Sequence, residues 1–177
     1  MSGPTPSPVS TRSEFSSYAD VDWENWEPRD RATLLFVMDA GRLLLIRKKR
    51  GLGAGKINGP GGRIEPGESP AECALRELEE EVGVVARAPR KCGEHHFQFT
   101  DGYSLHVYVF ASTDFSGDPI ETDEAVPMWV SQDELPYDEM WEDDRLWMPH
   151  LLAGRPFVGW YLFDGEAMVD YRLDVDP

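Results

Sequence analysis

The sequence predicts an α+β fold in which a mixed sheet lies between helices. Three pairs of apolar runs are each joined by a short turn, at 39–41, 101–102 and 164–165, and every turn contains Asp followed by Gly or by Ala-Gly. Such pairs are typical of β-hairpins. Two further segments, near 70–82 and 141–153, carry helix signals. The 177 residues suffice for one domain with a substantial core.

The expected strands follow from apolar or alternating runs bounded by turn residues. They cover 33–38, 42–47, 93–99, 104–112, 126–130, 157–163 and 167–173. Residues 51–62 contain six glycines and one proline, so we expect a loop there. The last helix should follow an acidic turn that begins at Trp141.

The first helix should run from about Pro70 to Val82. Ser69 is a good N-cap, Pro70 suits the first helical position, and Glu72 completes a Ser-x-x-Glu capping box. Gly83 is a natural C-terminal stop. The helical period predicts one apolar stripe that faces the core, formed by Ala71, Leu75, Leu78 and Val82.

The N-terminal part has a different composition. Residues 1–17 are rich in Ser and Pro, which predicts a flexible tail. An acidic extension with Trp23 and Trp26 follows over 18–30, and the sequence leaves open whether it packs on the domain. The domain itself is expected over 31–177.

Charge and composition exclude several classes of partner. The formal net charge of −16 argues against nucleic-acid polymers and anionic membranes. No stretch has the length of a transmembrane helix, and no signal-peptide core is seen at the N-terminus. The two cysteines, Cys73 and Cys92, suggest neither a disulfide framework nor a zinc site. We expect a cytoplasmic monomer.

The basic residues are not spread evenly. The segment 41–63 contains seven Lys or Arg residues and no acid, whereas 92–144 contains no Lys or Arg. A local basic segment could bind a polyphosphate within an acidic protein. For Arg42 and Arg50, an ordinary unpaired surface position is also plausible.

One long pattern occupies residues 62–84, which read GRIEPGESPAECALRELEEEVGV. Within the expected helix, Glu77, Glu80 and Glu81 fall at i, i+3 and i+4 and so share one face, while Glu72 and Glu79 point to solvent. Like charges at this spacing repel each other, and a bound cation would remove that penalty. Carboxylate oxygens suit Mg²⁺, or Mn²⁺ as an alternative. A solvated acidic helix face is the competing interpretation.

The pattern resembles the Nudix box, G-x5-E-x7-R-E-U-x-E-E-x-G-U, where U is aliphatic. The fixed positions are Gly62, Glu68, Arg76-Glu77-Leu78, Glu80-Glu81 and Gly83-Val84. The resemblance covers about residues 31–174 and implies an α/β/α sandwich with a mixed central sheet. It also implies metal-dependent hydrolysis of a nucleoside diphosphate linked to another moiety.

The resemblance assigns roles residue by residue. It implies a divalent cation bound by Glu77, Glu80, Glu81 and the Gly61 carbonyl, with a distant acid, Glu124, as a further ligand. The general base is Glu80 or Glu77, and the sequence does not choose between them. Arg76 should orient a neighbouring glutamate through a bidentate contact, and Glu68 should support the loop.

Three further stretches resemble the oxidised purine nucleoside triphosphatases of the mammalian type, which are MutT homologues. These are KKRGLGAGKINGPGGRIEPGE from residue 48, PYDEMWEDDRLWMP from 136 and GWYLFDGEAMVDYRL from 159. The resemblance implies substrates such as 8-oxo-dGTP and 2-hydroxy-dATP, cleaved to the monophosphate and pyrophosphate. The substrate-binding residues that it implies are Thr33, Lys48, Asn58, Pro60, Gly61, Gly62, Arg63, Phe97, Trp141, Asp143 and Asp144.

The base pocket follows from this set. Trp141 offers a flat face to a purine, and Asn58 offers a donor and an acceptor. In an apolar pocket, the adjacent carboxyls of Asp143 and Asp144 should differ in pKa, so that one donates while the other accepts. Alternatively, Asp143 and Asp144 could cap the following helix, and Trp147 could be a core residue.

Several positions leave the substrate open. Leu52 stands where the resembled enzymes have an aromatic residue, and Leu105 stands where they have methionine. The four histidines (95, 96, 106 and 150) show no metal-ligand spacing, so we expect ordinary surface or strand residues. The alternatives are a Nudix hydrolase of another substrate, such as ADP-ribose or a dinucleoside polyphosphate, and a non-catalytic nucleotide-binding module. No proline occurs between Pro89 and Pro119, which counts against the ADP-ribose branch.

Overall fold

The computed structural model describes residues 15–177, so most of the tail expected over 1–17 lies outside the described residues. The elements, in chain order, are η1 (Tyr18–Asp20), β1 (Asp30–Asp39), β2 (Arg42–Lys48), β3 (Ile57–Asn58), β4 (Gly61–Arg63), α1 (Pro70–Val82), β5 (Val85–Arg87), β6 (Arg90–Phe99), β7 (Ser104–Ser112), β8 (Asp114–Ser116), β9 (Ala125–Ser131), η2 (Tyr137–Glu139), α2 (Asp144–Leu152), β10 (Phe157–Asp164) and β11 (Ala167–Val175).

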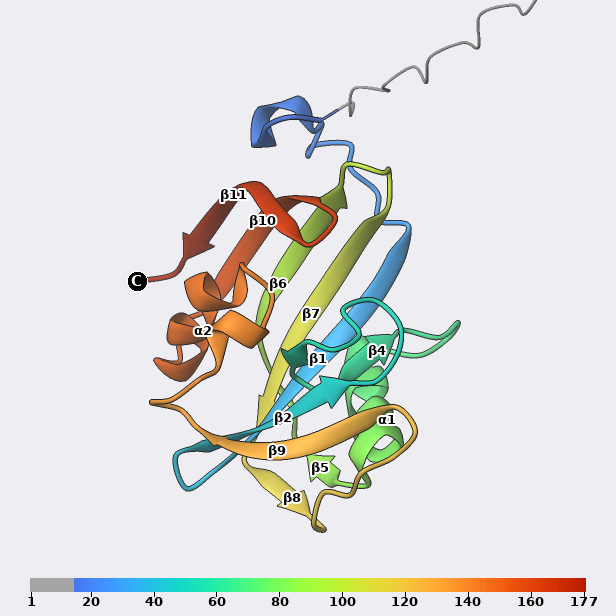
Figure 1. Ribbon diagram of the computed structural model, residues 1–177, viewed down its shortest axis with the longest axis vertical. Coiled ribbons are helices and arrows are strands. Elements are labelled where there is room, and N and C mark those ends of the chain that lie inside the picture. The colour runs from blue at the N-terminus through green and yellow to red at the C-terminus, as the bar shows by residue number, and fades with distance from the viewer. Residues whose placement is uncertain (1–14) are drawn as a thin grey trace, which may run out of the picture.

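A nine-stranded mixed sheet forms the centre of the molecule (Figure 1). The strand order is β11-β10-β6-β7-β1-β2-β3, with β4 also paired to β1 and β9 also paired to β2. The pairs β1–β7 and β6–β10 are parallel, and the other pairs are antiparallel. Strands β5 and β8 form a separate two-stranded sheet.

The two α-helices pack on opposite faces of the sheet. Successive side chains of a strand point to opposite faces, so alternate residues of β1 meet different helices. Leu35 and Val37 of β1 lie in one core cluster with Leu78 of α1. Phe36, between them, lies in the other cluster with Trp147 of α2. This layering confirms the predicted α+β class with a mixed sheet between helices.

The three predicted hairpins are present, and each contains a left-handed glycine in its turn, at Gly41, Gly102 and Gly165. The first hairpin is short, since β1 and β2 pair only at 38–39 with 42–43. Beyond that point, β1 pairs with β4 and β7, while β2 pairs with β3 and β9.

The sequence predicts a loop over the glycine-rich segment 51–62, and this prediction is wrong in part. The segment contains β3 and the start of β4. Gly61 shows why the backbone can join the sheet there. A Cβ atom at Gly61 would lie 1.8 Å from the Thr33 carbonyl oxygen. Glycine therefore allows β4 to lie closely against β1.

Helix α1 begins and ends where the sequence predicts, and Ser69 and Glu72 form the expected capping box. Its buried face differs from the predicted stripe. Ala74, Leu78 and Val82 are fully buried, whereas Ala71 and Leu75 lie at the margin. The helix is rotated so that the Glu81 side chain also faces inward.

The acidic extension packs on the domain. The Tyr18 backbone N–H donates to Asp170 Oδ2 at 2.7 Å, and Trp26 Nε1 donates to Gln98 Oε1 at 2.9 Å. Val21 is buried. Among the described residues, no helix is both long and apolar enough to cross a membrane.

His95 is not the ordinary residue that the sequence suggests. It lies on β6 but is fully buried, and neither ring nitrogen has a hydrogen-bond partner. Its ring packs among aromatic side chains, 4.6 Å from Trp147 and 5.2 Å from Phe157 between ring centroids. Burial lowers the pKa of His95 to about 3, and the neighbouring His96 and His106 add to this effect.

We predict that His95→Leu stabilises the protein, because a buried polar group without a partner costs about 1–3 kcal/mol. The folded state keeps His95 neutral, so wild-type stability falls as pH drops below the ordinary histidine pKa near 6.5. The advantage of the variant should widen by about 1–2 kcal/mol between neutral pH and about pH 5. Urea unfolding at several pH values measures this, with His95→Gln as the control that keeps a polar group. A destabilised Leu variant would contradict the prediction.

Candidate active site

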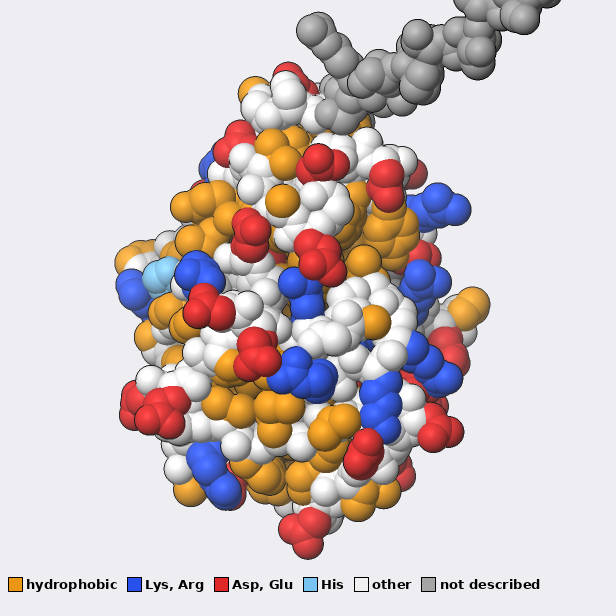
Figure 2. All heavy atoms as spheres, in the orientation of Figure 1, with side chains coloured by type: hydrophobic (Ala, Val, Ile, Leu, Met, Phe, Trp, Pro, Cys, Tyr) orange, Lys and Arg blue, Asp and Glu red, His pale blue; other side chains and the backbone are white. Residues whose placement is uncertain are grey.

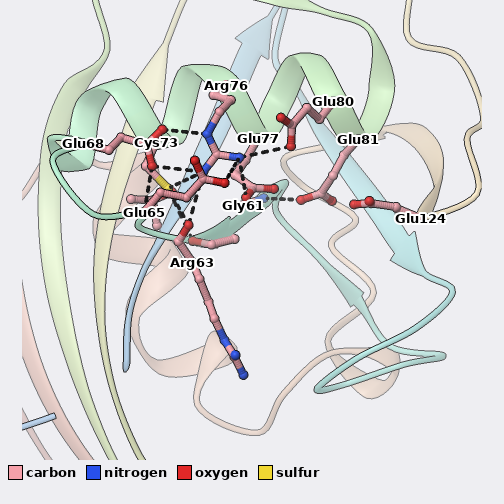
Figure 3. A network of polar contacts seen from close by, with 12 residues as sticks. Gly61, Arg63, Glu65, Glu68, Cys73, Arg76, Glu77, Glu80, Glu81 and Glu124 are labelled. Atoms are coloured by element: carbon pink, nitrogen blue, oxygen red, sulfur yellow. Dashed lines mark hydrogen bonds and ion pairs between the residues drawn. The ribbon is translucent and has the colours of Figure 1, made fainter. Parts of the chain in front are cut away.

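Arg76 is the centre of a carboxylate network on α1 (Figure 3). Its Nε and Nη2 donate to the two oxygens of Glu68 at 2.6 and 3.0 Å, which is a bidentate contact. Its Nη1 donates to Glu77 Oε1 at 3.0 Å and to Glu80 Oε2 at 3.1 Å. Nη2 also donates to the Arg63 carbonyl oxygen at 3.2 Å. One guanidinium therefore ties the helix to the loop before it.

Glu68 links this network to the loop as well as to the helix. It accepts a hydrogen bond from the Glu65 backbone N–H at 3.0 Å. The hydrogen bond from Arg76 lowers the pKa of Glu68 to about 2, against the effect of burial. The interaction stabilises the fold above the ordinary glutamate pKa and is lost as pH falls through about 2.

Three carboxylates gather beside this network, with one oxygen each from Glu77, Glu81 and Glu124 within 4.8 Å of one another. Figure 3 shows Glu81 of α1 and Glu124, which directly precedes β9, pointing toward each other. The Gly61 backbone N–H donates to Glu81 Oε1 at 3.1 Å. The fold thus brings the distant acid next to the helix.

Crowding and burial leave these acids short of compensating charge. Burial raises the pKa of Glu81 to about 8, with Glu77 and Glu124 adding to the rise while Gly61 N–H and Lys48 oppose it. Burial also raises the pKa of Glu77. Several carboxylate oxygens that converge on one point, and whose negative charges repel each other, suit a hard divalent cation. The residues present therefore fit the metal that the box implies.

Glu80 is placed differently from the two glutamates with which it was expected to share a face. Its side chain is 54% exposed and bonded to Arg76, and it is outside the group formed by Glu77, Glu81 and Glu124. The cause is the rotation of α1 that turns Glu81 inward and carries Glu80 outward.

Gly62 allows the backbone to pass close to the acids. A Cβ atom at this position would lie 2.3 Å from the Glu77 carboxyl carbon. Any larger residue would therefore displace the Glu77 carboxylate. Pro60, expected to contact substrate, is buried, and its carbonyl oxygen accepts from the Leu35 N–H at 2.8 Å.

Most basic residues of segment 41–63 are paired with acids, including Arg42 with Asp39 and Arg50 with Glu124. Among the described residues of this segment, Lys48 alone has no carboxylate within 4.0 Å of its Nζ. On the face drawn in Figure 2, basic and acidic side chains are intermixed. Lys48 is the cation left free to meet an anionic ligand.

A cavity of about 530 Å³ connects the acids to a second group of residues. Glu77, Glu81, Glu124 and Lys48 line it, together with Gly61, Gly62 and Arg63. The expected base-pocket residues line the same cavity, namely Thr33, Asn58, Phe97, Trp141, Asp143 and Asp144, and so do Trp147, Leu52 and Leu105. A cavity of this size suits a nucleotide.

The Asp143–Asp144 pair is almost fully buried at this cavity. Asp143 Oδ2 accepts from Trp147 Nε1 at 3.0 Å, and Asp144 Oδ2 accepts from the Trp141 N–H at 3.1 Å. Asp143 makes no side-chain cap to α2, so the capping alternative fails for it. Asp143 Oδ1 has no partner.

Burial raises the pKa of Asp143 to about 7, and it raises the pKa of Asp144 well above its usual value, helped by the charge of Asp143. Both carboxyls are therefore shifted toward their neutral form, which is the direction that the sequence predicts for one of them. For Asp143, the stability that its neutral carboxyl confers is present below the ordinary aspartate pKa and is lost as pH rises through about 7.

The remaining pocket residues are held by packing. Trp141 meets Phe99 and Phe163 edge-to-face, and Lys56 Nζ lies 5.2 Å from the centre of its ring. Thr33 Oγ1 lies 3.4 Å from Cys73 Sγ, and Asn58 Oδ1 accepts from the Gly59 N–H at 2.8 Å. Trp147 is both a core residue and a cavity wall.

Two features of the site were missed in the sequence. His95 lines the cavity, and alternation with Phe97 on the same strand could have revealed that both face one side. Arg50 forms an ion pair with Glu124 at 2.7 Å, which carries no local sequence signal because 74 residues separate them.

Comparison with known proteins agrees with this geometry. The NUDIX domain profile matches residues 28–151. The chain is 41% identical over 144 residues to an oxidized purine nucleoside triphosphate hydrolase of Danio rerio, and 38% identical over 143 residues to one of Mus musculus. Each alignment covers 80% of this chain and 92% of the relative.

A solved structure, the mutator MutT protein from Bacillus halodurans, aligns with a TM-score of 0.75 at 28% identity. It covers 84% of this chain and 99% of that one. The domain profile spans more than half of the sequence, and the layered fold and the box acids agree with it. This chain belongs to the NUDIX domain family.

Proposed function

We propose that this protein hydrolyses oxidised purine nucleoside triphosphates, such as 8-oxo-dGTP and 2-hydroxy-dATP, to the monophosphate and pyrophosphate, and so removes damaged nucleotides from the cellular pool. The observation that carries the proposal is that one cavity is lined both by the box acids and by the buried Asp143–Asp144 pair. The zebrafish and mouse relatives, both named oxidized purine nucleoside triphosphate hydrolases, support the same substrate class.

The acids would hold Mg²⁺, or Mn²⁺, through Glu77, Glu81 and Glu124, with Glu80 and the Gly61 carbonyl as further proposed ligands. The cation would neutralise phosphate charge and lower the pKa of a bound water. Arg76 fixes Glu77 and Glu80, and Lys48 would contact a phosphate as a point charge. Either Glu77 or Glu80 would accept the proton of the attacking water. The variant that loses the acid limb of the pH–rate profile identifies which one.

In the base pocket, the protonated carboxyl of the Asp143–Asp144 pair would donate to the purine edge while its ionised neighbour accepts. Moving that proton would let the pocket accept either purine. Trp141 would stack on the base, Asn58 would bond its edge, and Thr33 and Phe97 would complete the walls. Pro60, Gly61, Gly62 and Arg63 would shape the loop that holds the phosphates.

We further propose that the protein acts as a cytoplasmic monomer. Its two cysteines, Cys73 and Cys92, are free and buried, which fits a reducing compartment. The proposed hydrolysis of oxidised purine nucleoside triphosphates is tested by a coupled pyrophosphate-release assay over 8-oxo-dGTP, 2-hydroxy-dATP, dGTP and ADP-ribose. It fails if none of the triphosphates releases pyrophosphate.

We predict that Glu81→Gln lowers kcat/KM by about 100-fold or more and raises the Mg²⁺ concentration needed for activity, because it removes a buried ligand. Without Mg²⁺, the variant should melt at a higher temperature at neutral pH, because the amide is neutral at every pH and removes the cost of burying Glu81, whose pKa is raised chiefly by burial and further by Glu77 and Glu124.

Glu79→Gln is the matched control for this measurement, since Glu79 is exposed on the same helix and outside the acidic group. It should keep wild-type kcat/KM and Mg²⁺ dependence. Activity of Glu81→Gln above about a tenth of wild type, at the wild-type Mg²⁺ requirement, would contradict the ligand role.

We predict that Asp143→Asn and Asp144→Asn each lower the ratio of kcat/KM for 8-oxo-dGTP to that for dGTP by about tenfold or more, since a fixed amide cannot exchange its donor. The Mg²⁺ requirement should not change. Asp138→Asn is the control, because Asp138 lies in the same segment but is exposed. Equal losses on both substrates would argue against base reading.

A further inference from the structure

A second cluster of metal-ligating side chains lies outside the cavity. Glu94 and His96 of β6 and His106 of β7 each offer one ligand atom, and these atoms lie within 4.8 Å of one another. His96 and His106 are directly opposite each other in the antiparallel register, and Glu94 lies two residues before His96. Side chains two residues apart on a strand share a face. We call these three residues the Glu94–His96–His106 cluster.

The cluster is separate from the proposed active site. His95 and Phe97, which alternate with it on β6, line the cavity, whereas no member of the cluster does. The nearest aromatic neighbour of His106 on its own strand is Tyr108, at 4.3 Å between ring centroids, and Tyr108 packs with the α1-side core. The cluster therefore occupies the opposite face of β6 from the nucleotide cavity.

The two imidazoles are held by their surroundings. His96 Nδ1 lies 3.1 Å from the Gly159 carbonyl oxygen. A carbonyl can only accept, so Nδ1 carries the proton and Nε2 keeps a free lone pair. Metal-binding histidines are commonly oriented by this kind of bond. The His96 ring is stacked between His106 at 4.4 Å and Trp160 at 5.4 Å, and Trp26 meets it edge-on at 5.3 Å.

The carboxylate is also positioned. Glu94 Oε2 lies 2.9 Å from His106 Nε2, and Lys91 Nζ donates to the other oxygen, Oε1. The side chains of Glu94 and His106 are 24% and 13% exposed, so the group is shielded but reachable from solvent. A metal ion at this point would replace the proton shared by Glu94 and His106.

We propose that the Glu94–His96–His106 cluster is a binding site for a divalent transition metal of the Zn²⁺ class. Two imidazoles and one carboxylate favour Zn²⁺ over the Mg²⁺ expected at the box, since imidazole is a poor ligand for Mg²⁺. Three protein ligands leave a fourth position for water. Zn–N bonds of about 2.0 Å place tetrahedral ligand atoms about 3.3 Å apart. The ligand atoms of the cluster lie within 4.8 Å of one another, and the two imidazoles are stacked, so the side chains must rotate when an ion binds. The competing interpretation is an ordinary hydrogen bond beneath an aromatic stack.

The test is a calorimetric titration of the full chain with Zn²⁺ as the titrant. Excess Mg²⁺ is present throughout and the chain carries Glu81→Gln, so that the acids of the box compete less for Zn²⁺. We expect one equivalent of Zn²⁺ to bind. Co²⁺ should give the visible absorption of a four-coordinate site, and Zn²⁺ should raise the melting temperature.

Two variants separate a metal site from a structural contact. His106→Phe keeps a ring against His96 and Tyr108 but removes the nitrogen, and Glu94→Gln keeps the shape but removes the charge. Each should weaken Zn²⁺ binding by about tenfold or more. In the chain that keeps Glu81, each should leave nucleotide hydrolysis in Mg²⁺ unchanged. His150→Gln, on α2 and outside the cluster, should bind Zn²⁺ like the parent. Absence of the Zn²⁺ equivalent, or binding that both folded variants retain, would overturn the proposal whatever the enzymatic result.

Discussion

The arrangement of the candidate active site depends on one guanidinium group. Arg76 holds Glu68 with two hydrogen bonds and also reaches Glu77, Glu80 and the backbone of Arg63. Without the Arg76 guanidinium, the carboxylates of Glu68, Glu77 and Glu80 would repel each other at short range. The fixed spacing of the box follows from this contact, because an arginine eight residues after Glu68 reaches back across the first turns of the helix.

Local chemistry made much of the fold predictable. The cap at Ser69, the stop at Gly83 and the left-handed glycines of the three turns are short-range signals, and the elements that they delimit are present. The short strands β3 and β4 were not predictable in the same way. Glycine usually favours a loop, and here the close approach of Gly61 to Thr33 is set by tertiary packing. The rotation of α1 likewise depends on what the helix meets, which periodicity does not contain.

The candidate site also contains residues that local sequence signals predict and residues that only the tertiary fold brings together. The box residues lie close in sequence, so their proximity follows from one helix and one loop. Glu124, His95 and the Arg50 ion pair come together through the sheet, and residue type alone says little about them. Glu124 was found through family resemblance, whereas His95 was missed because a lone histidine on a strand usually has no special role. A strand that alternates between a cavity and another surface gives each of its residues a different environment.

Strand β6 shows how far this alternation goes. His95 faces an aromatic interior that keeps it neutral and unpartnered, while His96, the next residue, faces a carbonyl and a second imidazole. A histidine on one face of the strand therefore costs stability, because its ring nitrogens have no partners. On the other face, His96 and His106 each offer a ring nitrogen as a possible metal ligand. The difference arises from the period of the strand, because one residue of register exchanges the two environments. The sheet thus separates the cavity from the Glu94–His96–His106 cluster, with only the backbone of one strand between them.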